Sequence, residues 1–147
     1  KKFFESLKKC ELLINSSRGE VVDNLALTEA IKEGKMKYSA VDCWENEPNI
    51  SRELLDIVDI ATPHIAGYSA EGKSRATAMA LEAFEKHFGV SVEGKPVVLA
   101  PATGADVTGM QQIADSYSPF VDTDNLRKAP ENFEALRNNY DLRKEVM

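Results

Sequence analysis

Residues 11–62, "ELLINSSRGEVVDNLALTEAIKEGKMKYSAVDCWENEPNISRELLDIVDIAT", decide the fold, because short apolar runs alternate there with helical patterns. The apolar runs have the length of strands and are ELLIN (11–15), YSAVDCW (38–44) and VDIAT (58–62). ELLIN is continuous enough to indicate a strand buried on both faces. The helical patterns are NLALTEAIKEG (24–34), with Asp23 or Asn24 as cap and Gly34 as stop, and SRELLDI (51–57). This alternation predicts an α/β fold with a parallel sheet and right-handed crossovers.

A long helix is expected after the third strand. Apolar residues recur at helical spacing before a stop at Gly89, namely Ala76, Met79, Ala80, Ala83 and Phe84. Farther along, residues 94–101 indicate a strand, and residues 110–120 and 130–146 indicate helices. The composition changes near residue 92, which predicts a domain boundary there.

Charge and cysteine content narrow the class of protein. A formal net charge of −6 argues against nucleic-acid or membrane-surface partners, because phosphates are bound by concentrated Lys and Arg. The sequence has neither a membrane-length apolar run nor a signal peptide. The two cysteines, Cys10 and Cys43, form no disulfide framework and no zinc motif, which predicts a cytoplasmic protein.

Polar side chains follow each predicted strand at the edge where ligands bind in parallel sheets. Arg18 follows the first strand, Asp42 and Glu47 end or follow the second, and His64 follows the third. A histidine with a carboxylate makes an acid/base pair, and an arginine fork suits a substrate carboxylate. These residues together favour proton transfer at a hydroxyl or carbonyl beside an anionic group.

Other interpretations of the same residues are weaker. Taken singly, each is more often a surface or structural group, and His87 fits that description in the last turn of the long helix. A metal site of His64, Asp42 and Glu47 lacks a defined ligand spacing, so no metal is predicted. There is no G-x-S-x-G motif for a serine nucleophile.

Three segments resemble the NAD-dependent D-2-hydroxyacid dehydrogenase family. INSSRGEVVD (14–23), DCWENEP (42–48) and TPHIAGYSAEGK (62–73) are similar to its N-x-x-R-G-x-x-V-D, D-x-x-E-x-E-P and T-P-H patterns, in order and spacing. The variant HIAGYSAEGK (64–73) and the tail ENFEALRNNYDLRKE (131–145) are more similar to the branch that oxidises 4-phospho-D-erythronate in vitamin B6 biosynthesis. The resemblance implies the C-terminal half of a Rossmann-like doubly wound sheet, a long connecting helix and a small α/β dimerisation domain.

The resemblance also implies roles for the edge residues. His64 would be the acid/base at the substrate C2 oxygen, Glu47 would pair with it and favour its protonated form, and Arg18 would bind the substrate carboxylate. NAD would be held by Ser16, Ser17, Arg18, Asp42 and Gly67. The substrate, a small phosphorylated 2-hydroxy acid, would contact Tyr68 as well as Arg18, and Arg137 and Arg143 are candidates for its phosphate.

By the same resemblance, residues 1–66 would be the C-terminal half of the NAD-binding domain. Residues 67–92 would be the connecting helix, and residues 93–147 an incomplete dimerisation domain of a homodimer. The family's G-x-G-x-x-G turn is missing from the sequence. We therefore expect the chain to be an inactive C-terminal piece of a longer enzyme. Two alternatives stay open: a dehydrogenase for another acid, of the phosphoglycerate or hydroxypyruvate type, and a catalytically silent dimerisation module.

Overall fold

The computed structural model describes residues 2–95, 98 and 117–143. These residues fall into two compact units, one of residues 1–66 with 118–140 and one of residues 67–117 with 141–147. Each unit is described here by itself.

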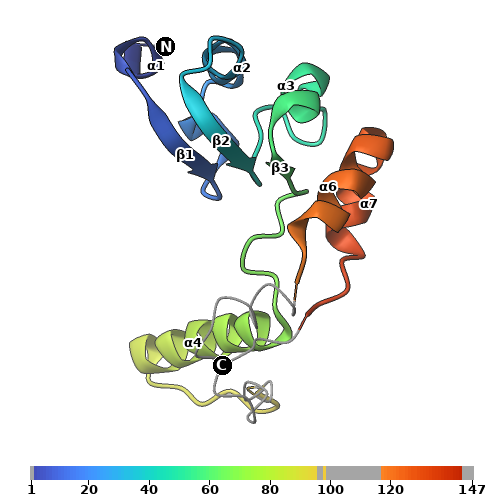
Figure 1. Ribbon diagram of the computed structural model, residues 1–147. Coiled ribbons are helices and arrows are strands. Elements are labelled where there is room, and N and C mark those ends of the chain that lie inside the picture. The colour runs from blue at the N-terminus through green and yellow to red at the C-terminus, as the bar shows by residue number, and fades with distance from the viewer. Residues whose placement is uncertain (1, 96–97, 99–116, 144–147) are drawn as a thin grey trace, which may run out of the picture. The chain divides into compact units, whose positions relative to one another are not determined.

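The first unit contains a three-stranded parallel sheet in the order β1-β2-β3 (Figure 1). The strands are β1 (Cys10–Asn15), β2 (Met36–Val41) and β3 (Ile60–Ala61). This arrangement confirms the parallel sheet predicted from the sequence. β2 begins two residues before the expected start and ends at Val41, so Asp42 and the two residues after it belong to a loop at the carboxyl edge.

Helices follow β1 and β2 as expected. α2 (Asn24–Lys32) begins where the Asp23 carboxylate accepts a hydrogen bond from the Ala26 N–H at 2.8 Å, and it ends before Gly34 at φ +68°. α3 (Arg52–Ile57) begins where the Ser51 hydroxyl accepts from the Leu54 N–H. Residues 1–66 also contain the short helix α1 (Lys2–Ser6) and the 3₁₀ turn η1 (Gly19–Val21).

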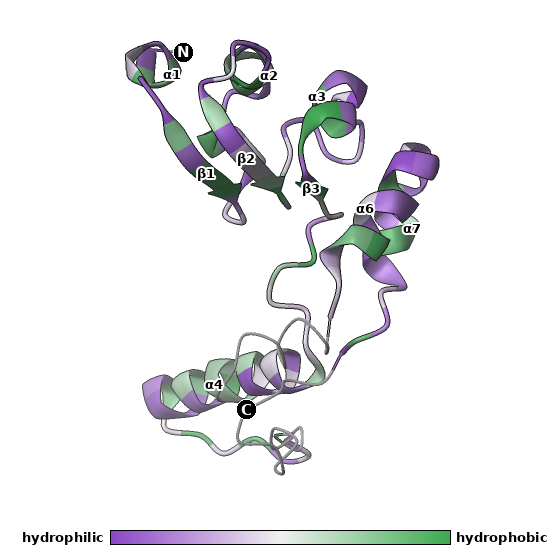
Figure 2. Cartoon of the chain, viewed as in Figure 1, coloured by the Kyte–Doolittle hydropathy of each residue, from purple (hydrophilic) through white to green (hydrophobic). Residues whose placement is uncertain are grey.

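The core lies between the sheet and these helices. Its largest fully buried side chains include Trp44, Leu27, Leu54, Leu55 and Val41. The green, hydrophobic stretches of α3 and β2 in Figure 2 belong to this core.

The far part of the chain returns to the open edge of β3, which the sequence did not predict. α6 (Pro119–Lys128), η2 (Pro130–Asn132) and α7 (Phe133–Asn138) belong to the first unit. The Thr123 hydroxyl accepts the Ala61 N–H at 3.0 Å, and Leu126 and Phe133 are buried in the core. α6 therefore covers the edge of β3, which pairs with no further strand among the described residues.

One expectation for β1 was wrong: only one of its faces is covered within the described residues. Leu12, Ile14 and the neighbouring Tyr38 of β2 are 52%, 63% and 51% exposed. The alternate residues Leu13 and Val41 pack in or against the core. The reason is that successive strand residues point to opposite faces, and α1, α2 and α3 supply the apolar partners of one face only.

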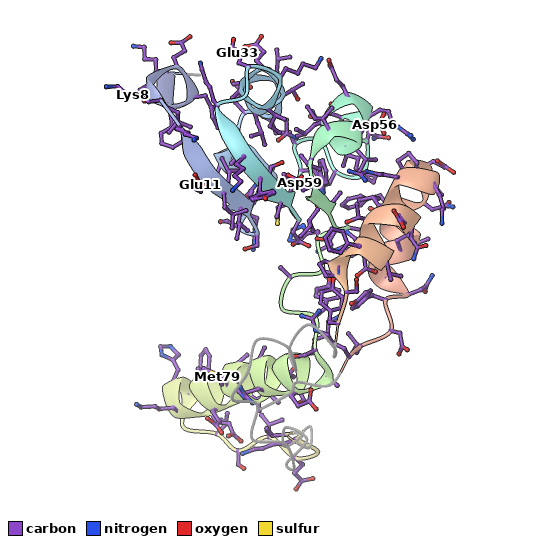
Figure 3. The ribbon with its side chains drawn as sticks, in the orientation of Figure 1. Lys8, Glu11, Glu33, Asp56, Asp59 and Met79 are labelled. Atoms are coloured by element: carbon purple, nitrogen blue, oxygen red, sulfur yellow. The ribbon has the colours of Figure 1, made fainter. Side chains whose placement is uncertain are left out.

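The second unit contains α4 (Ala70–Phe88), the long helix expected from the sequence. The Ser69 hydroxyl accepts the Gly72 N–H at its start, and Gly89 at φ +63° ends it. Within the described part of the chain its large apolar residues Met79, labelled in Figure 3, Phe84 and Phe88 are exposed.

Of the predictions for the C-terminal third, one is corrected by the structure and the others are not tested. Most of the predicted strand over 94–101 and most of the predicted helix over 110–120 lie outside the described residues. The predicted helix over 130–146 was too long, because α7 ends at Asn138 and Tyr140 follows it in non-helical chain. The domain boundaries near 66 and 92 stay predictions. None of the described helices is long and apolar enough to cross a membrane.

Candidate active site

A pocket of about 290 Å³ opens among the loops that follow the three strands. Its lining residues are Arg18, Gly19, Glu20, Trp44, Glu45, Asn46, Glu47 and His64. The pocket thus brings together the three residues that we expected to be catalytic, Arg18, Glu47 and His64. Each of them comes from a different loop at the carboxyl edge, where the strands of a parallel sheet end side by side.

His64 and Glu47 form a hydrogen-bonded pair. Nδ1 of His64 lies 2.8 Å from Oε2 of Glu47, and both side chains are about one-fifth exposed. The other carboxylate oxygen, Oε1, accepts the Trp44 N–H at 2.8 Å, which holds Glu47 in place. With the Glu47 oxygen as the acceptor of this hydrogen bond, Nδ1 of His64 carries the hydrogen and Nε2 is the ring nitrogen that the bond leaves unused.

Asn15, for which we expected no role from the sequence, holds the Arg18 loop. Its Nδ2 donates to the Arg18 carbonyl at 3.1 Å and to the Cys43 carbonyl at 2.9 Å. Asn15 is buried, while the Arg18 side chain is exposed and can reach a ligand. One feature of the sequence could have indicated this role of Asn15: it is the polar residue that ends the apolar run of the first strand.

Gly19 brings the same loop close to the end of β2. A Cβ atom at Gly19 would lie 2.0 Å from the Trp44 carbonyl oxygen, a distance that no side chain tolerates. A glycine after Arg18 is therefore required for the two loops to form one pocket wall.

Asp42 is buried and is not among the residues that line the pocket. Its Oδ1 accepts the Thr62 hydroxyl at 2.6 Å, the Ile65 N–H at 2.7 Å and the Ala66 N–H at 3.1 Å. The residue is 7% exposed. Its expected contact with the nicotinamide carboxamide stays a prediction, and its carboxylate already has partners from this chain.

Cys43 is fully buried next to the acidic groups. Burial, followed by the negative charges of Asp42 and Glu47, raises the pKa of the Cys43 thiol from 9.0 to about 12. Among the described residues, donor atoms within 4.8 Å of one another belong to Cys43, Glu47 and His64, a different set from the one considered with Asp42. Of these three groups, the Cys43 thiol is the one whose raised pKa works against the deprotonated form that binds metals.

The other expected ligand residues are Ser16, Ser17, Gly67 and Tyr68. Ser16 and Ser17 are exposed directly after β1 and do not line the pocket. Gly67, at φ +80°, and Tyr68, whose ring lies 3.7 Å from Lys73 Nζ, belong to the second unit.

Binding of the substrate phosphate by Arg137 and Arg143 also stays a prediction. Arg137 lies in α7 of the first unit. Arg143 lies in the second unit, where its guanidinium packs 4.2 Å from the Tyr117 ring centre.

Residues 1–66 match the family model of the D-isomer specific 2-hydroxyacid dehydrogenase NAD-binding domain. The similarity to this family is confined to residues 1–66 of the chain. The matched segment contains β1, β2, β3 and every residue of the pocket. The match confirms the expected Rossmann-like NAD-binding fold and the expected cofactor, NAD, whereas the small α/β dimerisation domain stays a prediction.

The chain is also similar to curated relatives over nearly its whole length. It is 43% identical over 145 residues to the erythronate-4-phosphate dehydrogenase of Bacteroides thetaiotaomicron, covering 97% of this chain and 42% of that protein. It is 44% identical over 147 residues to the enzyme of the same name from Bacteroides fragilis, covering 99% and 42%, respectively. For the Acinetobacter baumannii enzyme of that name the identity is 39% over 158 residues, covering 98% and 44%. The chain therefore spans less than half the length of these relatives.

The residues at the carboxyl edge fit the polar end of a dinucleotide. Ser16 and Ser17 present exposed hydroxyls there, and Arg18 adds an exposed cation. These groups suit the ribose and carboxamide of NAD, which bind by hydrogen bonds.

Proposed function

We propose that the protein is an NAD-dependent dehydrogenase that oxidises 4-phospho-D-erythronate to its 2-oxo acid, in the biosynthesis of vitamin B6. The observation that carries the chemistry is the His64–Glu47 pair, which shares one pocket with Arg18. The substrate is proposed from the relatives named erythronate-4-phosphate dehydrogenase.

His64 acts as the base in the oxidation. Its Nε2 accepts the proton of the C2 hydroxyl, and the Glu47 carboxylate stabilises the imidazolium that results. NAD supplies the acceptor for the hydride that leaves C2. The C–H and O–H bonds at C2 break and a C=O bond forms, with the proton going to His64 and the hydride to NAD.

Arg18 binds the anionic end of the substrate. Its exposed guanidinium offers a bidentate fork to the C1 carboxylate and a donor to the developing C2 carbonyl. The Asn15 hydrogen bond to the Arg18 carbonyl keeps the backbone of this residue in place. The guanidinium itself donates through Nη1 to the Ser17 carbonyl at 2.7 Å, and an arginine oriented in this way favours the near-attack geometry that the reaction needs.

The proposal also covers the oligomeric state and the cellular location of the enzyme. We propose a homodimer, with Tyr68 near the substrate and with Arg137 and Arg143 as candidates for its phosphate. A cytoplasmic location agrees with the two free cysteines, Cys10 and Cys43.

The test is NADH formation by the protein at its natural full length. 4-Phosphoerythronate is compared with glycerate, lactate and 3-phosphoglycerate at equal concentrations. Strong preference for 4-phosphoerythronate is the expected result. Turnover with another acid alone would keep the mechanism and overturn the substrate, and turnover with none of them would favour the silent dimerisation module.

A further inference from the structure

The Asp42 carboxylate organises the loop that carries His64. Besides the Thr62 hydroxyl, its oxygens accept the consecutive N–H groups of Ile65 and Ala66, with Ala66 also 3.2 Å from Oδ2. The Asp42 carbonyl accepts the His64 N–H at 2.9 Å. One residue thus receives hydrogen bonds from both sides of His64 and from His64 itself.

This set of bonds matters because His64 has an unfavourable backbone conformation. Its φ is +54°, in the left-handed region that residues with a Cβ seldom adopt. A free loop would relax from this conformation, and the imidazole would then point elsewhere. The convergence of two successive N–H groups on one buried carboxylate is strong enough to offset the strain.

We propose that Asp42 is a positioning residue: it holds the loop of residues 62–66 so that His64 keeps its hydrogen bond to Glu47. The role of His64 as a base rests on the proposed function, whereas the positioning of its ring does not. This role differs from the contact with nicotinamide expected from the sequence. The two roles are separable because one acts on the state of His64 and the other on cofactor affinity.

The first experiment reads the His64 ring directly. The chain contains two histidines, so the side-chain ¹⁵N shifts of His64 can be recorded with His87, on α4, as an internal reference. In the unmodified chain we expect the hydrogen on Nδ1, as the bond to Glu47 requires. Asp42→Ala shifts His64 toward the Nε2–H form that free imidazole favours, while His87 does not change.

Matched variants separate positioning from general destabilisation. Asp59→Ala is the control, since Asp59, labelled in Figure 3, is also an acidic residue beside the sheet and accepts the Ser39 N–H at 2.7 Å. It should leave the His64 spectrum unchanged. Asp42→Asn keeps one acceptor oxygen and should restore most of the Nδ1–H form. If Asp42→Ala does not fold, Thr62→Val removes one donor to Asp42 and should shift the spectrum less, with Thr62→Ser restoring it.

The second experiment measures turnover by the protein at its natural full length. Asp42→Ala should lower kcat about 10- to 100-fold, the effect of a misplaced catalytic group, with KM for NAD unchanged. An unchanged His64 spectrum together with a raised KM for NAD would overturn the proposal and assign Asp42 to the cofactor. If the protein turns over none of the acids, the proposed function fails, and the spectra of Asp42→Ala and Thr62→Val still decide the positioning role.

Discussion

His64 Nδ1 lies 2.8 Å from Glu47 Oε2, although the two residues are 17 positions apart in the chain. The pair forms because Glu47 follows β2 and His64 follows β3, and these parallel strands end side by side. The bond fixes both the orientation and the tautomer of the imidazole. It is the contact on which the proposed acid/base chemistry depends.

Glu47→Gln should lower kcat/KM about 100-fold or more, because a neutral amide no longer stabilises the imidazolium. Steady-state NADH formation by the protein at its natural full length is the measurement. Glu53→Gln is the control, since Glu53 is exposed on α3 and pairs with Lys32. Equal activity of the two variants would remove Glu47 from the mechanism.

Arg18→Lys should raise KM for the hydroxy acid about tenfold, the equivalent of one lost charge-assisted hydrogen bond. Lysine keeps the positive charge and loses the two-pronged geometry. Arg52→Lys is a suitable comparison, because Arg52 is exposed on α3 and pairs with Asp56. An unchanged KM in Arg18→Lys would mean that the guanidinium does not bind the carboxylate.

Gly19→Ala should lower the free energy of unfolding by about 3 kcal/mol, because the new methyl group would overlap the Trp44 carbonyl. In Gly89→Ala the new methyl group has no atom within 4 Å, so the free energy of unfolding falls only by the cost of a positive φ, about 1 kcal/mol. Urea denaturation of both variants gives the comparison. A Gly19→Ala protein as stable as Gly89→Ala would show that the two loops do not pack as described.

The Cys43 thiol should stay protonated and unreactive at pH 8, because its pKa is raised to about 12. A thiol reagent should therefore modify one cysteine, Cys10, in the folded chain and both after unfolding. Rapid reaction of two thiols in the folded chain would contradict the burial of Cys43.

The same pKa shift makes stability depend on pH. Between pH 9 and pH 12 the unfolded chain loses the Cys43 proton while the folded chain keeps it, so stability falls as pH rises. The slope attributable to this group approaches about 1.4 kcal/mol per pH unit within that window. Cys43→Ser removes this contribution, and the difference between the urea curves of the two proteins at pH 8 and pH 10 measures it. Equal differences at both pH values would show that the thiol does not titrate in this way.

Much of the first unit follows from local sequence patterns. The strand–helix–strand alternation in residues 11–62 predicts a parallel sheet, and Asp23, Ser51 and Gly34 mark helix ends because caps and left-handed residues act locally. α6 was missed, since its residues gain their partner, the edge of β3, only in the folded chain. The exposed face of β1 was missed for a similar reason: an apolar run does not reveal what covers it.

The sequence by itself determined the fold class and which side chains end each strand, because strand ends and their loops are encoded by neighbouring residues. Arg18, Glu47 and His64 could be named as candidates on that ground. Only the tertiary structure decided what holds them. Asn15 secures the Arg18 loop, and Asp42 gathers the N–H groups around His64. The bonds from Asn15 to the Cys43 carbonyl and from the Ile65 and Ala66 N–H groups to Asp42 join different strands and loops, so their donors and acceptors meet only when the parallel strands are in register.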